Sequence, residues 1–442
     1  MSSIQAYTSA TSVVPGQHID FLVSYDHETS SPDFTIDFYR IGEPERYVGQ
    51  RNGRADAYAT LDDYNYSGCQ WPPGYSLQVP EDWTSGAYRA RFTGSSGDTT
   101  DVLFVVTAAA PGTTSKVLLA LAVNTYQAYN AWGGSSLYSA PRSVTVTFNR
   151  PGDHMGFLKN VGEQSFISWA ERNNIALEYG TSVDLHAHPE MLEPYQLLVS
   201  VGHDEYWSKE MRDGVEAFIA NGGNVAFLSG NVCWWQVRFE QNNRRMVCYK
   251  SDENPATPDP LIPTSLATIH WFHVNRPENQ LTGVSFRNGA GWWDDWPAGQ
   301  PYPNYVVRDS QHWVFNGTRL QNGDLFGSDA QILWDETDAT EFVEQHGVPR
   351  VTGHDFTPTS FRMLATADLR SWKNQQGWAT MGIYQNNGGS VFTAATIGWA
   401  RGLQANDQVV SQITKNVITR LSEPGLGNRG MGWLSLLLDD AD

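Results

Sequence analysis

Cysteine is scarce in this chain of 442 residues, which contains only Cys69, Cys233 and Cys248. Three cysteines cannot form a disulfide framework, and no CxxC spacing occurs. Cys233 and Cys248 could pair only if the protein were exported to an oxidising compartment. Because free cysteines are commonly buried, we expect all three to be buried thiols.

Positive charge is also sparse, because 29 Lys and Arg stand against 48 Asp and Glu, a formal net charge of -19. A protein this acidic is a poor general binder of phosphate backbones and of anionic membrane surfaces. We therefore expect neither a nucleic acid nor a membrane as a partner, while a homo-oligomer stays open.

Long apolar runs are missing as well. No run approaches the roughly 18 apolar residues that span a bilayer. The first residues, MSSIQAYTSATS, lack the basic segment and apolar core of a signal peptide. We expect a cytoplasmic protein, although export of the natural protein stays open. The 40% apolar and 12% aromatic content is ample for a sizeable core.

Residues 1–108 show the pattern of an all-β domain. Apolar residues occupy every second position of HIDFLVSY, FTIDFYRI and AYRARF, which predicts half-buried strands. Several short strands of this kind predict an immunoglobulin-like sandwich. The stretch TAAAPGTTSK, residues 107–116, is typical of a linker.

Residues 116–424 follow a different pattern. KVLLALAV, YQLLVSVG and NVAFLSG are apolar runs typical of strands covered on both faces. QSFISWAERNN and SKEMRDGVEAFIANGG have helical spacing, and Ser208 can cap the second of these helices. Strand, helix and strand joined by short loops predict a doubly wound α/β domain. Long aromatic loops at about 232–390 interrupt it, and such loops are where sites tend to form.

Charged residues directly follow one of the buried strands, since LLVSVGHDEYW places His203, Asp204 and Glu205 at its end. In open α/β sheets, ligands bind outside the carboxyl ends of the strands. The first strand of the domain leads in the same way into NTYQAYNAWGGSSLY. We therefore expect the two strand ends to bring together Tyr126, Tyr129, Asn130, Tyr138, His203, Asp204 and Glu205.

This set of side chains suits a metal ion. Phenolate and carboxylate oxygens are hard ligands that favour highly charged cations. Two tyrosinates and one glutamate supply three negative charges, which matches ferric iron, and three protein ligands leave positions for water and substrate. Against this interpretation, tyrosine-rich loops commonly serve packing and hydrogen bonding, and one HDE tripeptide is weak support for a metal site.

Four stretches, in this order, resemble the C-terminal domain of the N,N-dimethylformamidase large (beta) subunit family. They are NTYQAYNAWGGSSLY, LLVSVGHDEYWSKEMRDGVEAFIANGGNVAFLSGN, QILWDETD and GGSVFTAATIGWARGL. The resemblance covers roughly residues 110–422, and the N-terminal sandwich is similar to the family's as well. It implies a glutamine-amidotransferase-like fold for the α/β domain and hydrolysis of a small-molecule amide.

The resemblance also implies a mononuclear, non-haem ferric ion held by two tyrosines and one glutamate. The glutamate corresponds to Glu205 and the second tyrosine to Tyr138. The first is Tyr129 or Tyr126, and Tyr129 is preferred because the family tolerates tryptophan at the position of Tyr126. His203 would lie beside the metal. Glu336, in WDE where the family has GYE, would be the catalytic general base.

The predicted mechanism is hydrolysis of an amide whose carbonyl oxygen binds the metal. Glu336 would carry a proton from water to the departing nitrogen, a role that favours a raised pKa of Glu336. An aromatic pocket would suit small N-alkyl amides. Its candidate residues are Tyr126, Asn130, Trp132, Trp207, Trp234 and Trp235.

Two alternatives remain open. In one, zinc replaces iron and His203 becomes a ligand, which keeps the hydrolase but changes the metal. In the other, the chain binds carbohydrate or a partner protein through exposed tryptophans, and the α/β domain is a catalytically silent scaffold.

Overall fold

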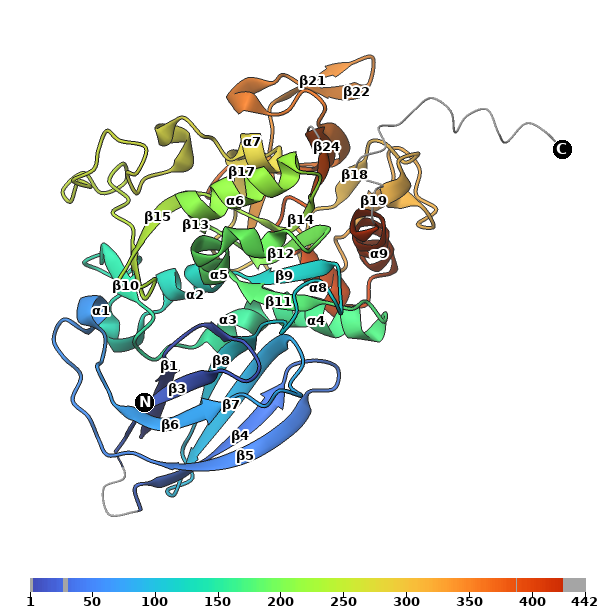
Figure 1. The fold of residues 1–442 in the computed structure, drawn as a ribbon. Helices are drawn as coiled ribbons and strands as arrows, with labels where there is room; N and C mark the ends of the chain where they lie inside the picture. The colour runs from blue at the N-terminus through green and yellow to red at the C-terminus, as the bar shows by residue number, and fades with distance from the viewer. Residues whose placement is uncertain (1–2, 27–30, 387, 424–442) are drawn as a thin grey trace.

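The computed structural model describes residues 3–26, 31–386 and 388–423. The predicted first domain includes residues 1–2 and 27–30, and the predicted second domain includes residue 387 and ends at residue 424. All of these lie outside the described residues. Figure 1 shows a β-rich N-terminal region beside a larger region of helices and strands.

Two β-sheets share one core in the N-terminal region. The first has the strand order β1 (Ile4–Thr8), β3 (His18–Tyr25) and β6 (Pro73–Gln78). The second has the order β2 (Ser12–Val13), β8 (Thr99–Val106), β7 (Gly86–Gly94), β4 (Asp33–Arg40) and β5 (Arg46–Arg54). The predicted alternation is confirmed in β3 and β4, where every second residue is buried in this core: Ile19, Phe21, Val23, Tyr25, Phe34, Ile36 and Phe38.

A nine-stranded sheet forms the centre of the larger region. Its order is β11 (Glu178–Thr181), β9 (Val117–Leu121), β12 (Leu197–His203), β14 (Asn224–Gly230), β25 (Gly389–Thr393), β24 (Trp378–Asn386), β23 (Arg362–Asp368), β18 (Tyr305–Val307) and β19 (Leu325–Phe326). Neighbouring strands from β11 to β25 pair in parallel, and those from β25 to β19 pair antiparallel. The three predicted buried strands are β9, β12 and β14, and all their residues are buried.

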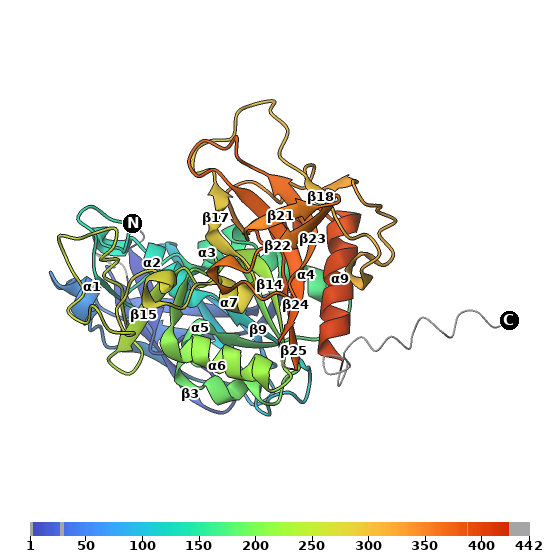
Figure 2. The ribbon, with the colours of Figure 1, turned by 90° about the horizontal axis from the view of Figure 1, so that it is seen from above.

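Helices cover both faces of the parallel strands. On one face α5 (Ser182–Ala187) and α6 (Lys209–Ala220) share a core with Leu118 and Leu198 of the sheet. On the other face, neighbouring sheet residues share a core with α4 (Glu163–Arg172), α8 (Trp399–Gln404) and α9 (Gln408–Ser422). Figure 2 shows α6 and α9 on different sides of these strands. The predicted cap of α6 is confirmed, since Ser208 Oγ accepts a hydrogen bond from the Met211 N–H.

Two small sheets form next to the carboxyl ends of the parallel strands. One has the order β10 (Thr145–Thr147), β16 (Arg245–Val247), β15 (Trp235–Glu240) and β13 (Tyr206–Ser208). The other consists of β17 (Ser285–Gly291) and β20 (Glu336–Ala339). Because β13 begins shortly after β12 ends, the chain between the two strands is fixed at both ends. A bridge between Thr337 and Thr396 ties β20 to the segment that follows β25.

Further sequence predictions can be compared with the described residues. β8 ends at Val106 and β9 begins at Val117, on either side of the predicted linker. All three cysteines are free and buried, as predicted. Within the part of the chain that the structure describes, no helix combines the length and the apolar character that crossing a bilayer requires.

Candidate metal centre

The predicted metal ligands lie at the carboxyl ends of the parallel strands. Helix α2 (Val123–Tyr129) follows β9 and has Tyr129 as its last residue. Tyr138 lies in the loop after the short helix η1 (Trp132–Gly134), and Glu205 lies between β12 and β13. The fold therefore brings the two tyrosines and the glutamate to the same edge of the sheet.

Both tyrosine hydroxyls donate hydrogen bonds to the carboxylate of Glu205. The distance from Tyr129 Oη to Glu205 Oε2 is 2.9 Å, and that from Tyr138 Oη to Glu205 Oε1 is 2.8 Å. The two phenol rings stack with their centroids 4.2 Å apart. Tyr129, Tyr138 and Glu205, which we call the tyrosine cluster, thus share one small volume. Of the two candidates for the first tyrosine, Tyr129 is the one that reaches Glu205.

The phenols of the tyrosine cluster are strongly held in their neutral form. Burial raises the pKa of Tyr129 and of Tyr138 well above the ordinary value, and the charge of Glu205 raises both further. Tyr138 exposes 38% of its surface, but its hydroxyl is enclosed and also accepts a hydrogen bond of 2.6 Å from Tyr206 Oη. Without a cation, both phenols are therefore proton donors to Glu205.

The backbone around Glu205 is fixed on both sides. Its N–H donates to Thr125 Oγ1 at 3.0 Å, and its carbonyl accepts from the N–H groups of Trp234 at 2.9 Å and Trp235 at 3.0 Å. The strand bends just before, at Gly202, where φ is 79° and an added Cβ would overlap a backbone carbonyl at 2.1 Å. These constraints hold the carboxylate in one position at the strand end.

His203 lies between two carboxylates. Its Nε2 is 3.0 Å from Glu336 Oε2 and 3.4 Å from Glu205 Oε2. Burial alone lowers the pKa of His203, but the negative charges of Glu336 and Glu205 outweigh burial and raise the pKa to about 9. His203 is therefore protonated at neutral pH, and it connects the tyrosine cluster to the predicted general base.

One cation and two hydrogen-bond donors surround the carboxylate of Glu336. Besides His203, Asn231 Nδ2 donates to Oε2 at 3.0 Å and Trp293 Nε1 donates to Oε1 at 2.9 Å. Burial raises the pKa of Glu336, but the charge of His203 and these hydrogen bonds outweigh it, so the pKa is lowered. The predicted raised pKa is therefore wrong. The positive charge of His203 beside the carboxylate, which the sequence did not reveal, reverses the effect of burial.

Asp204 and Trp207 turn away from the tyrosine cluster. Asp204 accepts hydrogen bonds from Ser200 Oγ at 2.8 Å and from Trp207 Nε1 at 2.9 Å, and burial raises its pKa to about 6. The Trp207 ring lies in the core beneath α6. The structure thus places Trp207, a predicted pocket residue, in the interior, where it supports the strand end.

Three other predicted pocket residues also have partners elsewhere. Tyr126 stacks on Phe157 with ring centroids 5.6 Å apart. The side chain of Asn130 donates to a backbone carbonyl of a neighbouring loop at 2.8 Å. Trp132 meets the ring of Tyr64, from the N-terminal region, at 5.5 Å. These contacts support the loops that carry Tyr129 and Tyr138, and they are not directed at Glu205 or Glu336.

Four residues of the site were not singled out from the sequence: Tyr206, Asn231, Lys250 and Trp293. Asn231 and Tyr206 had a detectable signal, because Asn231 directly follows β14 and Tyr206 follows Glu205. Lys250 and Trp293 lie in irregular segments, where the sequence shows no helical or strand periodicity. The ammonium group of Lys250 is buried 3.7 Å from the ring centroid of Tyr138, and no hydrogen-bond acceptor for it occurs among the described residues.

The tyrosine cluster fits a trivalent cation by its donor chemistry. Glu205 is 2% exposed and receives its two shortest side-chain contacts from phenolic protons. A ferric ion would replace those protons and gain three negatively charged oxygens, the hard donors it prefers. His203 Nε2 lies 3.4 Å from Glu205 Oε2, and once deprotonated it would also permit the zinc alternative.

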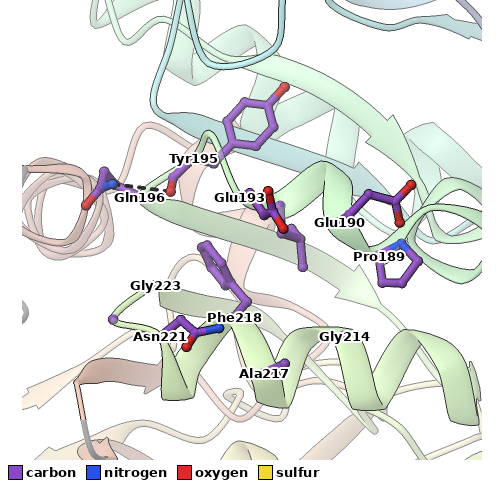
Figure 3. Close-up of a pocket in the computed structure, with 12 residues that line it drawn as sticks. Pro189, Glu190, Glu193, Tyr195, Gln196, Gly214, Ala217, Phe218, Asn221 and Gly223 are labelled. Atoms are coloured by element: carbon purple, nitrogen blue, oxygen red, sulfur yellow. Dashed lines mark hydrogen bonds between the residues drawn. The ribbon is translucent and has the colours of Figure 1, made fainter.

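A separate cavity of about 610 Å³ lies between α6 and the short helix η2 (Pro189–Leu192). Figure 3 shows Tyr195 and Phe218 among the side chains around it. None of the residues that line this cavity belongs to the tyrosine cluster or contacts Glu336. It is therefore distinct from the candidate metal centre.

The fold and the site define an α/β protein with buried phenol, carboxylate and imidazole groups at the carboxyl ends of its strands, a common location of active sites. The chain belongs to the N,N-dimethylformamidase beta subunit-like family, since the model of the family's C-terminal region matches residues 35–412. The predicted resemblance is confirmed, and the match begins earlier than predicted, inside the N-terminal β region.

Comparison with other known proteins adds little. None of the curated proteins matches the chain. Among solved structures, a beta-galactosidase from Bacillus circulans sp. alkalophilus is 11% identical over 68% of this chain and 31% of its own, with a TM-score of 0.35. A ThuA-like protein from Parabacteroides merdae is 13% identical over 69% of this chain and 89% of its own, with a TM-score of 0.26. This chain thus spans less than a third of the galactosidase, and similarity this low supports no conclusion about fold.

Proposed function

We propose that this protein is an amide hydrolase that uses a mononuclear, non-haem ferric ion bound by Tyr129, Tyr138 and Glu205. Membership of the dimethylformamidase-like family supports the hydrolase class. The observation that carries the finer proposal is the pair of phenol oxygens at 2.9 and 2.8 Å from the two oxygens of one buried carboxylate. If each phenol lost its proton, the two phenolates and the carboxylate would together form a set of ligands with three negative charges.

A ferric ion bound there would polarise an amide carbonyl and lower the pKa of a water molecule. The chain itself supplies a rigid frame for the three ligands. Stacking holds the phenol rings against each other, and backbone hydrogen bonds fix Glu205. Such preorganisation reduces the reorganisation that the reaction would otherwise require.

Glu336 is the proposed general base. Its lowered pKa keeps the carboxylate ionised at neutral pH and therefore ready to accept a proton from water. The same shift makes Glu336 a weaker base, so the water has to be made more acidic by its surroundings. Glu336 would then return the proton to the departing amine nitrogen. His203, 3.0 Å from Glu336 and 3.4 Å from Glu205, is the proposed positioning residue between base and ligands.

The proposed substrate is a small amide with few polar groups. Trp293 donates to Glu336 through its indole nitrogen while 56% of the residue is exposed. Its ring therefore borders the general base on the solvent side and offers an apolar contact for alkyl groups on the amide nitrogen. Because the other two groups that contact the base, His203 and Asn231, are buried, the alkyl groups would approach from this side.

Metal analysis of the freshly purified full chain tests the proposal. We expect about one iron per chain, a tyrosinate-to-iron charge-transfer band, and loss of both in Tyr138→Phe. Tyr126→Phe is the matched control, because Tyr126 is buried on α2 and its hydroxyl has no hydrogen-bond partner within the described ranges. Iron-free wild-type protein that takes up no ferric ion, or an iron content and a charge-transfer band that are both unchanged in Tyr138→Phe, would rule the proposal out.

We also propose a fold for each of the two regions, in line with the family resemblance. Residues of about 1–108 would form an immunoglobulin-like sandwich, and residues of about 116–424 a glutamine-amidotransferase-like domain. The shared core of the two N-terminal sheets and the helices on both faces of the parallel strands support them. An experimental structure, superposed on representatives of both fold classes, tests each assignment separately.

A further inference from the structure

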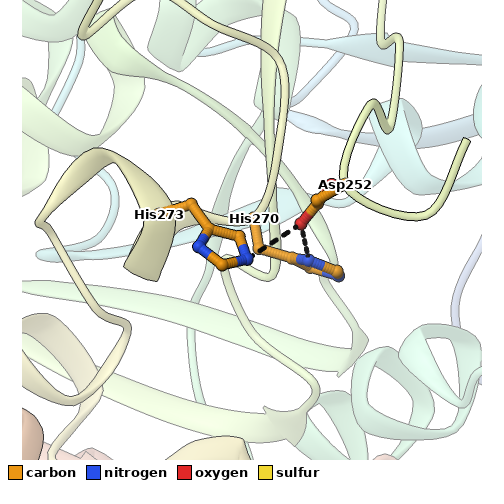
Figure 4. A group of neighbouring side chains, drawn as sticks. All are labelled: Asp252, His270 and His273. Atoms are coloured by element: carbon orange, nitrogen blue, oxygen red, sulfur yellow. Dashed lines mark hydrogen bonds and ion pairs between the residues drawn. The ribbon is translucent and has the colours of Figure 1, made fainter. Parts of the chain in front are cut away.

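A second group of potential metal ligands lies outside the tyrosine cluster. One ligand atom from each of Asp252, His270 and His273 lies within 4.8 Å of the other two. Figure 4 shows both imidazole rings directed at the carboxylate. His270 Nδ1 contacts Asp252 Oδ2, and His273 Nε2 is 3.4 Å from the same oxygen. We propose that these three residues, here called the histidine cluster, bind a divalent transition-metal ion of the zinc class.

The local backbone brings the two imidazoles together. His270 and His273 flank one turn at the start of the short helix η3 (Trp271–Val274), closed by a hydrogen bond of 3.0 Å from the His273 N–H to the His270 carbonyl. Residues three apart on such a turn lie on the same side. Asp252 comes from a separate segment, which is joined to this one by a hydrogen bond of 3.0 Å from the Lys250 N–H to the Thr268 carbonyl.

The ring of His270 is fixed before any ion binds. It is 6% exposed and stacks on Trp235 and Phe272, with centroid distances of 3.7 and 5.0 Å. Its Nε2 has no hydrogen-bond partner in the described part of the chain, and Glu253 Oε1 lies 3.7 Å from it. An imidazole whose ring is held in place by stacking loses little conformational freedom when it binds a metal ion.

Glu253 supports one tautomer of His270. In the structure Nδ1 bonds to Asp252 Oδ2, while Nε2 faces Glu253 Oε1 at 3.7 Å without a hydrogen bond. Binding of a metal ion through Nδ1 would move the ring proton to Nε2, where the Glu253 carboxylate would stabilise it. Metal-binding histidines commonly hold their second nitrogen against a carboxylate in this way. Glu253 would thus be a positioning residue for the ligand His270.

The donor types indicate which ion fits. Two imidazole nitrogens with one carboxylate favour zinc and its neighbours over magnesium or calcium. Ligands about 2.0–2.2 Å from a tetrahedral zinc lie roughly 3.3 Å apart, close to the 3.4 Å between His273 and Asp252. His270 and Asp252, now in hydrogen-bond contact, would have to separate slightly. Because His273 and Asp252 are exposed, the fourth position is open to water.

The histidine cluster has no ligand in common with the tyrosine cluster. Trp235 lies between them, because its ring stacks on His270 while its backbone N–H donates to the Glu205 carbonyl. The ammonium group of Lys250 lies 4.7 Å from the Trp235 ring and 3.7 Å from the Tyr138 ring. A buried cation and an indole therefore separate the two sites, so each should bind its ion without the other.

Titration of the full chain with zinc ions alone tests this proposal, with iron content measured beforehand. We expect one zinc site whose affinity falls at least tenfold in Asp252→Asn and in His273→Ala. The His273 side chain is half exposed, and Asp252→Asn keeps the shape of the side chain, so the variants should fold, and circular dichroism with thermal melting checks this. His354→Ala is the matched control, because His354 lies 3.4 Å from Glu341 and 3.3 Å from Asp355 but has no second imidazole in its group.

Two further variants separate this proposal from the proposed function. Tyr138→Phe and Glu205→Gln should abolish iron binding and leave zinc affinity unchanged. Zinc affinity lost in these variants would place the ion in the tyrosine cluster and overturn the second site, as would a wild-type chain that binds no zinc. X-ray absorption of the zinc-loaded wild type should show two imidazole ligands, and a spectrum with none would also overturn it.

Discussion

The tyrosine cluster and the histidine cluster differ in donors, burial and support. The first offers oxygen ligands, with its carboxylate 2% exposed, at the end of a strand in the central sheet. The second offers two nitrogens and one oxygen on loop segments, and two of its three residues are exposed. One chain thus places a cluster of hard oxygen donors and a cluster of softer, mixed donors only a few side chains apart.

Burial explains why the two sites should serve different purposes. In the tyrosine cluster, removal from water keeps the phenols protonated, so only a strongly charged cation would displace their protons. In the histidine cluster, imidazole nitrogens need lose no proton in their neutral form, so a divalent ion suffices. The first site therefore suits chemistry on a substrate, and the second suits reversible occupation by a metal.

The largest effect is expected from Glu205→Gln, which removes the charged centre of the tyrosine cluster. The negative charge would be lost and one of the two acceptor oxygens would become an N–H donor, so iron content and amide hydrolysis should fall to background. Zinc affinity of the histidine cluster should be unchanged. Iron analysis, the visible spectrum and a hydrolysis assay measure the three outcomes. A variant that keeps its iron would show that Glu205 is not a ligand.

A smaller effect is expected from Glu336→Gln, which keeps the metal ligands and removes the proposed base. Activity should fall by roughly 10²–10⁴-fold while iron content and the charge-transfer band are retained. Glu344→Gln is the control, because this exposed glutamate only pairs with Arg308 at 3.5 Å. Full activity in Glu336→Gln would exclude the proposed role, and loss of iron would assign Glu336 to the metal instead.

Trp293→Phe tests the hydrogen bond that the Trp293 indole donates to the proposed general base, Glu336, from the solvent side. A hydrogen bond to a charged group contributes roughly 1.5–3 kcal/mol, and this exposed one should lie at the low end, so we expect activity to fall roughly tenfold. Trp296→Phe, whose indole donates instead to the Gln300 carbonyl at 2.9 Å, is the control in the same loop. Equal kinetics in the two variants would show that the contact with Glu336 does not matter for catalysis.

Much of the parallel sheet could be predicted, because buried strands and amphipathic helices give local patterns of apolar residues in the sequence. β9, β12, β14 and α6 follow from apolar runs, helical spacing and the cap at Ser208. The antiparallel strands β18, β19, β23 and β24 could not, since they lie among Trp-, Gly- and Pro-rich loops and are defined by pairing with distant residues. Pairing with distant residues produces no recognisable local pattern of apolar residues in the sequence.

The candidate site also consists of residues that could be predicted from the sequence and features that could not. Strand ends identified Tyr129, Tyr138 and Glu205 among several candidates, and the family resemblance selected these three as ligands and added Glu336. Side-chain direction was beyond the sequence, so Trp207 was expected in the pocket and lies in the core. The pKa of Glu336 was predicted in the wrong direction because it depends on a contact with His203, more than a hundred residues away in the chain.

The smallest effect is expected from zinc on the stability of the fold. An ion that binds only the folded chain stabilises it by about 2.7 kcal/mol at a concentration one hundred times its Kd. Wild type should therefore melt at a slightly higher temperature with zinc, and chelation should reverse the shift. Asp252→Asn should show no shift, whereas His354→Ala should behave like wild type. An equal shift in Asp252→Asn would mean that zinc binds outside the histidine cluster, and the contrast between the two clusters would then be lost.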